Sequence, residues 1–402
     1  MKLGKSKVLL ALVAALVALA MIATGCGGSS SSSGDGEKKT VTIKIGIGAP
    51  LTAGAVALGK GMERGTNLAI EQANELQDAT DLGIKFESVS GDDQGDPKTG
   101  VTVANTFAST PGLVGVMGHL NSGVSIPASK VYNQNNIVQV SPASTNPALT
   151  LQGFDNVFRV CTIDTVQGSF AADAATADLG FKKAYVVDDS TPYGEGLAKF
   201  FAEQFAADGG EVLGTAKTSD KDTDFNALVT KIMAAGPDVL YYGGIYNAGA
   251  LLAKQAKEAG LKATFMSGDG MYDPEFINLA GEANAEGAFC TSIGLPLDKL
   301  PEGQQFETSY KAKYPNDEIA AYDAYSYDAA NVIIDAVLKV AKDLGVAKVT
   351  TTEGKKAIIA AVAATNTQGV SGAISFDENG DTTNKAVTLY TVKGGEWGAW
   401  EK

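Results

Sequence analysis

Short apolar runs alternate with longer segments of helical spacing from residue 41 onward, and this alternation constrains the fold more than any other feature. The short runs are bounded by Gly, Pro, Asp or Asn and read as strands: Ile43–Ile47, Ile84–Val89, Leu113–Met117, Ile137–Val140, Ala184–Val187, Val239–Tyr242 and Ala263–Met266. The longer segments read as helices: Met62–Leu76, Lys98–Ala108, Gly123–Asn133, Phe170–Leu179, Leu197–Ala207, Phe225–Ala234 and Ala250–Ala259. Such alternation predicts an α/β fold with parallel sheets covered by helices on both faces.

The length and composition of the chain predict two lobes. Hydrophobic residues make up 45% of the sequence and charged residues only 19%, which indicates a packed globular body. A single hydrophobic core stops growing at about 250–300 residues. The strand–helix region from residue 40 to 402 exceeds that size, so we expect it to divide.

The first 25 residues have the order of a secretory signal peptide. Lys2, Lys5 and Lys7 precede the apolar run Val8–Ala23, and small residues lead to Cys26. A membrane-spanning helix is the alternative, because the run is close to the length of about 18 residues that spanning requires. The stretch resembles a bacterial lipobox, which implies that Cys26 receives a lipid before residues 1–25 are removed.

A flexible tether is expected after the lipid-bearing residue. Residues 26–39 are rich in Gly and Ser and too polar to pack, so the fold should begin near Thr40, held on the outer side of the cytoplasmic membrane. Removal of residues 1–25 takes away three lysines and no acid, and the net charge falls from −14 to −17. Such a chain has no basic surface for phosphates, which argues against nucleic acid as a partner.

Polar loops follow the predicted strands where a parallel sheet binds its ligands. Ligands of open α/β sheets sit beyond the carboxyl ends of the strands. The loops at these ends are 118–123, 141–145, 188–194, 243–247 and 267–273. They are divided between the two halves of the chain, so we expect them to face each other across a cleft.

The sequence lacks the usual signals of catalysis. His119 is the single histidine, and it reads as a hydrogen-bonding loop residue rather than a base. No G-x-S-x-G, H-E-x-x-H, C-x-x-C or phosphate-loop pattern occurs, and the dinucleotide pattern that starts at Gly46 fails at Leu51. We therefore expect a protein without catalytic residues, metal or cofactor.

Several of these loops carry motifs of one family. The motifs are Asp92-Asp93, Gly118-His119-Leu120-Asn121-Ser122, Ser141-Pro142-Ala143-Ser144-Thr145, Asp164 to Gly168, Tyr193-Gly194-Glu195-Gly196, Tyr241-Tyr242-Gly243-Gly244 and Ser267-Gly268-Asp269-Gly270. In this order, from about Lys44 to about Phe376, the chain resembles the leucine/isoleucine/valine-binding proteins of ABC transporters. The resemblance implies a type I periplasmic binding protein: two Rossmann-like lobes joined by a three-strand hinge.

The resemblance also implies discontinuous lobes. Residues 40–160 with 292–371 should form the N-terminal lobe, and 163–289 with 376–402 the C-terminal lobe. We expect the crossovers near Arg159–Ile163, Phe289–Ile293 and Gly372–Phe376, which would place Cys161 and Cys290 in neighbouring strands. A disulfide between these cysteines and two buried free thiols are both open alternatives.

The family pattern assigns roles to residues of the facing loops. Ser122 and Thr145 should hold the ligand carboxylate, and Ser122 would cap the helix that starts at Gly123. The Ala143 carbonyl, the Thr145 hydroxyl and Asp269 should take the ammonium group, with Ser144 in the same loop. Tyr193 should close over the ligand from the second lobe.

The side chain of the ligand is less well defined by the sequence. The expected pocket consists of Leu58, Tyr246, Met271, Tyr272 and Tyr322, although Leu58 and Tyr322 would also suit a hydrophobic core. The chain departs from the best-known members of the family at four places: Asp269 replaces Glu, Ile245 and Leu58 replace aromatic residues, and Gly95 with Asn121 replaces the usual disulfide.

The sequence thus predicts a monomeric, lipid-anchored solute-binding protein that delivers an amino acid, branched-chain or similar and apolar, to an ABC permease. Its lobes should close around the ligand by hinge bending. The same fold also suits an amide, a urea-like molecule or an aromatic acid, and a sensory receptor ectodomain is a third possibility.

Overall fold

The computed structural model describes residues 40–402, which form one compact unit. The predicted signal peptide 1–25, the tether 26–39 and the lipidated Cys26 lie outside the described residues. Within residues 40–402, no helix combines the length and the apolar character that crossing a membrane requires.

The first sheet has five parallel strands within the described chain, in the order β2-β1-β3-β4-β5. The strands are β1 (Val41–Ala49), β2 (Ile84–Asp92), β3 (Leu113–Gly118), β4 (Val138–Ser141) and β5 (Val157–Arg159). The helices around them are α2 (Val56–Glu75), α3 (Gln77–Leu82), α4 (Pro97–Ser109), α5 (Ser122–Gln134), α13 (Asp323–Leu344) and α14 (Thr352–Ala363).

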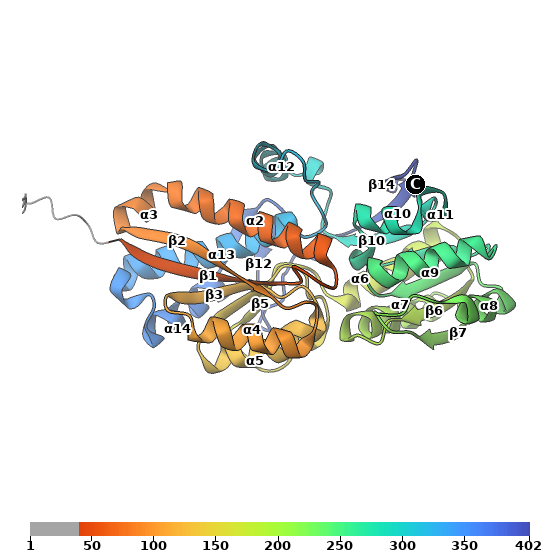
Figure 1. Ribbon diagram of the computed structural model, residues 1–402, viewed down its shortest axis with the longest axis horizontal. Coiled ribbons are helices and arrows are strands. Elements are labelled where there is room, and N and C mark those ends of the chain that lie inside the picture. The colour runs from red at the N-terminus through yellow and green to blue at the C-terminus, as the bar shows by residue number, and fades with distance from the viewer. Residues whose placement is uncertain (1–39) are drawn as a thin grey trace, which may run out of the picture. The chain divides into compact units, whose positions relative to one another are not determined.

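Alternate side chains of the first sheet pack into two different apolar layers. Ile45 and Ile47 of β1 join Met62 of α2 and Ile333 of α13 in one core, while Phe107 of α4 belongs to the core on the other face. Helices therefore cover both faces of this sheet, with α2 and α13 on one and α4 and α5 on the other (Figure 1).

The second sheet has seven strands within residues 183–399, in the order β14-β13-β10-β9-β8-β6-β7. They are β6 (Lys183–Asp188), β7 (Glu211–Lys217), β8 (Val239–Gly243), β9 (Thr264–Ser267), β10 (Phe289–Ile293), β13 (Val387–Lys393) and β14 (Glu396–Ala399). The β13 strand runs antiparallel to β10 and to β14, and the other pairs are parallel.

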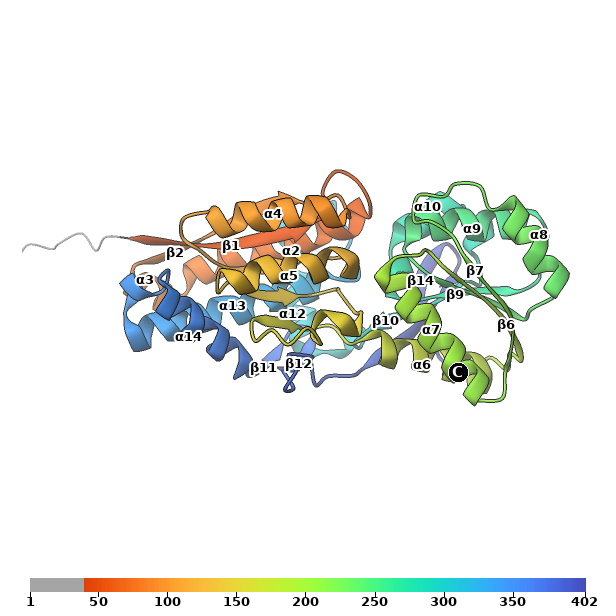
Figure 2. The same ribbon diagram turned by 90° about the horizontal axis from the view of Figure 1, so that it is seen from below.

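Helices also flank the second sheet (Figure 2). They are α6 (Asp164–Asp173), α7 (Pro192–Ala207), α8 (Asn226–Ala235), α9 (Tyr246–Glu258), α10 (Pro274–Ala280) and α11 (Glu282–Ala285). Neighbouring residues of β8 show that both faces are buried: Tyr241 packs with Phe201 of α7, and Tyr242 belongs to the core that includes Leu252 of α9.

The remaining elements lie between these strands and helices along the chain. They are η1 (Pro147–Leu149), the π-helical turn η2 (Ala174–Asp178), η3 (Asp269–Met271), η4 (Leu297–Lys299), α12 (Pro301–Lys313), η5 (Val346–Lys348) and the hairpin β11 (Asn366–Gly369) with β12 (Gly372–Ser375). The chain leaves the first sheet after β5, returns to it in α13 and reaches the second sheet again in β13. The Phe289–Ile293 segment, near which we predict a crossover, lies in the second sheet; the lobe boundaries themselves stay a prediction.

Candidate functional site

Asp269 is the side chain on which residues of both halves converge. It follows β9 of the second sheet, is fully buried, and accepts hydrogen bonds from the Tyr193 hydroxyl at Oδ1 (2.8 Å) and from the Tyr322 hydroxyl at Oδ2 (2.7 Å). Tyr193 lies in α7 of the second half, and Tyr322 directly precedes α13, which packs on the first sheet. The predicted residues Tyr193, Asp269 and Tyr322 are therefore brought together.

Burial controls the protonation of this cluster. It raises the pKa of Asp269, and the hydroxyls of Tyr322 and Tyr193 oppose that rise. It also raises the pKa of both tyrosines well above the ordinary value, so each hydroxyl remains a donor near neutral pH. A carboxylate held by two neutral donors in a buried site is suited to receive a positively charged group.

The loop after β4 places three further predicted residues in buried positions. The Thr145 hydroxyl has no hydrogen-bond partner among the described residues, and Ala143 lies two residues before it. The Ser144 hydroxyl is directed to the protein itself, because it lies 2.7 Å from the Ser125 hydroxyl and 2.9 Å from the carbonyl of Leu120. Burial raises the pKa of Asp164 and the Thr145 hydroxyl opposes that rise, so Thr145 faces this acid, whereas Ser144 holds its own loop in place.

The predicted capping role of Ser122 is wrong. Helix α5 begins at Ser122 itself, with Asn121 in the N-cap position and no side-chain cap hydrogen bond. The Ser122 hydroxyl instead accepts a hydrogen bond from the backbone N–H of Asn146 at 3.2 Å. The physical reason is tertiary: the loop after β4 brings this N–H to Ser122, so the hydroxyl joins two loops at the start of the helix.

Asp164 is a buried acidic residue without an assigned role in the sequence. It opens α6, its two carboxylate oxygens have no hydrogen-bond partner among the described residues, and its backbone N–H donates to the Thr145 carbonyl at 2.9 Å. Burial raises the pKa of Asp164 to about 8, and the charge of Asp269 adds to that rise. The sequence feature that could have identified Asp164 as a site residue is its position in the family motif from Asp164 to Gly168.

Gly196 allows α7 to approach this buried acid. A Cβ atom at Gly196 would lie 2.5 Å from Oδ2 of Asp164 and 2.8 Å from Nδ2 of Asn146, closer than real Cβ contacts. The amide of Asn146 also donates to the carbonyl of Pro192 at 2.6 Å. A side chain at this position would therefore push α7 away from the loop that carries Thr145.

The residues expected around the ligand side chain are dispersed. Leu58 is fully buried in the core of the first half, as its alternative role predicted. The Tyr246 hydroxyl accepts from the backbone N–H of Ala57 at 3.2 Å, which links the two halves. Met271 packs under α9, since a Cβ atom at Gly249 would lie 2.3 Å from its Cε.

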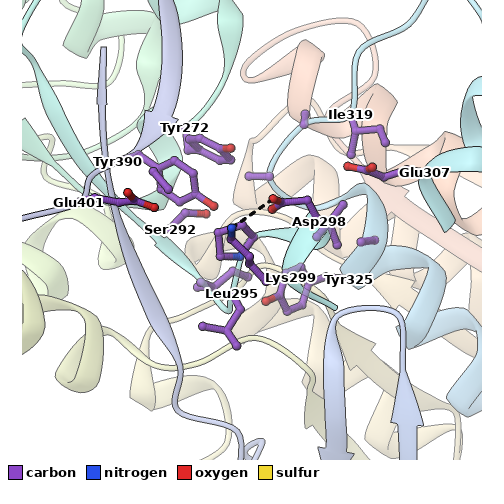
Figure 3. A pocket seen from close by; sticks show the side chains of 17 residues that line it. Tyr272, Ser292, Leu295, Asp298, Lys299, Glu307, Ile319, Tyr325, Tyr390 and Glu401 are labelled. Carbon is purple, nitrogen blue, oxygen red and sulfur yellow. Dashed lines mark ion pairs between the residues drawn. The ribbon is translucent and has the colours of Figure 1, made fainter. Parts of the chain in front are cut away.

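Tyr272, which we expect in the side-chain pocket, lines a cavity whose wall does not include Asp269. Its ring centroid is 4.2 Å from that of Tyr390. Both rings line a cavity of about 420 Å³ beside residues 292–299 (Figure 3). Figure 3 also shows Ile319 and Glu307 on the opposite side of this cavity. The Tyr272 ring thus packs against β13.

His119 has a structural role in the first half. Its Nδ1 lies 2.6 Å from Oδ2 of Asp93 and its Nε2 lies 2.8 Å from the Tyr132 hydroxyl, and all three side chains are fully buried. The His119 carbonyl lies 3.0 Å from the Ser141 hydroxyl. His119 therefore fixes the loop between β3 and α5 from behind.

The two described cysteines are free thiols. Cys161 and Cys290 are both buried, and burial raises the pKa of each thiol. Of the two open alternatives, the structure has the pair of buried thiols.

Comparison with known proteins identifies relatives along nearly the whole described chain. A family model described as periplasmic binding protein matches residues 42–396. Leu/Ile/Val-binding protein homolog 1 of Brucella abortus is 34% identical over 364 residues, which cover 88% of this chain and 89% of that protein.

Solved structures give the same result. A leucine-binding protein from Thermotoga maritima has a TM-score of 0.81 at 31% identity and covers 89% of this chain and 98% of that chain. An ABC transporter substrate-binding protein from Desulfitobacterium hafniense, solved in complex with Leu, has a TM-score of 0.72 at 26% identity and covers 90% and 100%. These matches confirm the predicted α/β class, the two-lobed fold and the resemblance on which it rests.

Proposed function

Because this chain belongs to the periplasmic binding protein family, we propose that it is the extracytoplasmic solute-binding protein of an ABC importer and binds an amino acid between its two lobes. A branched-chain or similar apolar side chain is the first candidate, since the relatives from Brucella abortus and Thermotoga maritima are named for such ligands. We further propose that the protein acts as a monomer, is anchored through Cys26 on the outer side of the cytoplasmic membrane, and delivers its ligand to membrane permease subunits.

The observation that carries the proposal is the environment of Asp269. It is a fully buried carboxylate with a hydrogen-bond donor from each half of the protein. No lysine or arginine appears among the groups that affect its pKa most strongly, so a ligand ammonium is a suitable counter-charge. The Thr145 hydroxyl and the start of α5 beside Ser122 supply donors for the ligand carboxylate.

Hydrogen bonds that join the two halves support the proposal of hinge closure. The Asn247 amide donates to the carbonyl of Gly54 at 3.0 Å, in addition to the Ala57–Tyr246 and Asn146–Pro192 bonds described above. We propose that these bonds break when the lobes open to admit ligand and form again on closure, which removes the charged ligand from water.

Isothermal titration calorimetry of residues 40–402 tests the proposal. Three ligands separate the two ends of the zwitterion: leucine, 4-methylpentanoate, which lacks the ammonium, and 3-methylbutylamine, which lacks the carboxylate. We expect leucine to bind at least about 100-fold more tightly than either analogue, because each loses charge-assisted hydrogen bonds in a buried site. Absence of binding by every amino acid in a panel of twenty would refute the proposal.

A second ligand class keeps the fold and changes the role of Asp269. Burial raises the pKa of this carboxyl, and a protonated Asp269 would suit an amide, a urea-like compound or an aromatic acid, none of which carries an ammonium group. Binding of benzoate or an aliphatic amide that persists in Asp269→Asn would support this class. A sensory receptor ectodomain is distinguished by uptake: reconstituted permease should transport the ligand only when this protein is present.

A further inference from the structure

A second cavity lies between the loops of the two halves, apart from the cavity of Tyr272. Its volume is about 430 Å³. Ala55, Gly95 and Asn121 line it from the first half, and Asp189, Ile245 and Ala248 line it from the second. The wall thus comes from the same strand-end loops that carry the candidate site.

Two buried oxygen atoms in this wall have no hydrogen-bond partner among the described residues: Oδ1 of Asn121 and Oδ2 of Asp189. The side chain of Asp189 is only 2% exposed. A buried acceptor without a partner is unfavourable by about 1–3 kcal/mol, and more when it is charged. These atoms therefore favour a group that donates hydrogen bonds.

The two acceptors are not needed by the fold. Oδ1 of Asp189 already accepts from the backbone N–H of Thr191 (2.9 Å) and from its hydroxyl (2.6 Å), so that oxygen orders the turn before α7 and Oδ2 is left over. Asn121 occupies the N-cap position of α5 without making a side-chain cap. Its Oδ1 instead faces Gly95, where a Cβ atom would lie 3.4 Å away.

The charge of the wall is negative around Asp189. Burial raises the pKa of Asp189 to about 6, and Asp220 and Asp188 add to the rise, so most of this carboxyl is ionised at pH 7. Lys221 also lines the cavity and is exposed, and Asp96 lies on the opposite loop. Three carboxylates and one amine in the wall leave an excess of negative charge.

The cavity adjoins the Asp269 cluster through consecutive residues of α7. The Tyr193 hydroxyl bonds Asp269, and the Cβ position of the next residue, Gly194, is 2.2 Å from Oδ1 of Asp189. Ile245 lies between the two sites: it lines the cavity, and its Cγ1 is 3.2 Å from the Cβ position of Gly270. Consecutive residues of α7 therefore lie against the two carboxylates.

We infer that this cavity is a side-chain subsite for a cationic donor, an ammonium or guanidinium group at the end of a long amino-acid side chain, held by Asn121 Oδ1 and Asp189 Oδ2. The inference rests on the proposed function, because Asp269 must hold the α-ammonium of the same ligand. An apolar side chain of equal length would leave both acceptors without a partner.

Calorimetry of residues 40–402 with norleucine, lysine and arginine tests the subsite. Norleucine matches the carbon chain of lysine without its terminal ammonium, so the ratio of their dissociation constants isolates the terminal group. We expect lysine or arginine to bind at least about 10-fold more tightly than norleucine, as charge-assisted bonds in a buried site require. Asp189→Asn and Asn121→Ala should each reduce this ratio toward one.

Asp328→Asn is the matched control, since it removes a carboxylate that is as deeply buried as Asp189 and Asp328 is not part of the cavity wall. It should keep the ratio of the unmodified protein. Norleucine binding as tightly as lysine and arginine would overturn the subsite and leave the proposed function standing, whereas absence of binding by all amino acids would overturn both. The subsite would also be overturned if both Asp189→Asn and Asn121→Ala keep the preference for lysine or arginine over norleucine. If Asp189→Asn does not fold, the result for Asn121→Ala alone decides whether the subsite exists.

Discussion

Asp269→Asn separates the role of this residue in binding from its role in the fold. The substitution keeps the size and shape of the side chain and removes the negative charge. Both carboxylate oxygens are buried, and each accepts one tyrosine hydroxyl. The change therefore removes the counter-charge for an ammonium group with little change in packing.

The expected loss of affinity follows from the burial of the pair. Loss of one member of a buried, hydrogen-bonded charge pair weakens binding by about 2–5 kcal/mol. At about 1.4 kcal/mol per factor of ten, leucine affinity should fall by roughly 30- to 5,000-fold. Calorimetry with residues 40–402 measures this directly.

The ligand-free protein should respond in the opposite direction. The folded pKa of Asp269 is raised, so its protonated form contributes stability that is present below the unfolded pKa of about 3.9 and is lost as pH rises toward the folded value. Asp269→Asn does not suffer this loss. Urea unfolding without ligand should show a variant at least as stable as the unmodified protein at pH 8.

Asp328→Asn provides a matched control for binding. Asp328 is also buried, but it accepts hydrogen bonds from the backbone N–H groups of Val370 (3.0 Å) and Ser371 (2.8 Å) rather than from the tyrosines that bond Asp269. Its substitution should leave leucine affinity unchanged. If Asp269→Asn binds leucine within about 3-fold of the unmodified protein, the assignment of Asp269 to the ammonium is refuted.

Three further outcomes are expected. Burial raises the pKa of Asp164 to about 8, so the free energy of unfolding should fall between pH 4 and pH 8. Urea unfolding of Asp164→Asn should show a smaller fall over this range. The same dependence on pH in both proteins would contradict the burial argument. Gly196→Ala should lower the free energy of unfolding by about 1–3 kcal/mol, because its Cβ would lie 2.5 Å from Asp164, while Gly398→Ala, with no atom within 4 Å, should be neutral in the same thermal melt. Cys161 and Cys290 should react with a maleimide only after unfolding, and to the same extent with and without reductant. Rapid labelling of the folded protein would disprove their burial.

The placement of strands and helices could be predicted from the sequence because the relevant signals are local. All seven expected strands occur, for example Val239–Tyr242 within β8, because a short apolar run bounded by turn residues determines its own conformation. Boundaries were less certain. Helix α6 begins at Asp164 rather than near Phe170, since its first turn is stabilised by packing in the second half rather than by an apolar repeat.

The candidate site was likewise predicted in part from the sequence. The motifs placed Tyr193, Thr145 and Asp269 on strand-end loops, and the sequence alone indicated that these loops are divided between two halves that face each other. It did not indicate that the Ser144 hydroxyl bonds the protein itself, or that Tyr272 packs against Tyr390. These details depend on contacts between residues far apart in the chain.

The sequence by itself determined the α/β class, the order of the elements and the loops that carry ligand-binding chemistry, because hydrophobic period and turn residues act over a few neighbouring positions. Only the tertiary structure decided which polar atoms are buried without a partner, among them both oxygens of Asp164 and Oδ2 of Asp189. Burial is a property of everything packed around an atom, and the residues that bury these carboxylates come from distant segments of the chain.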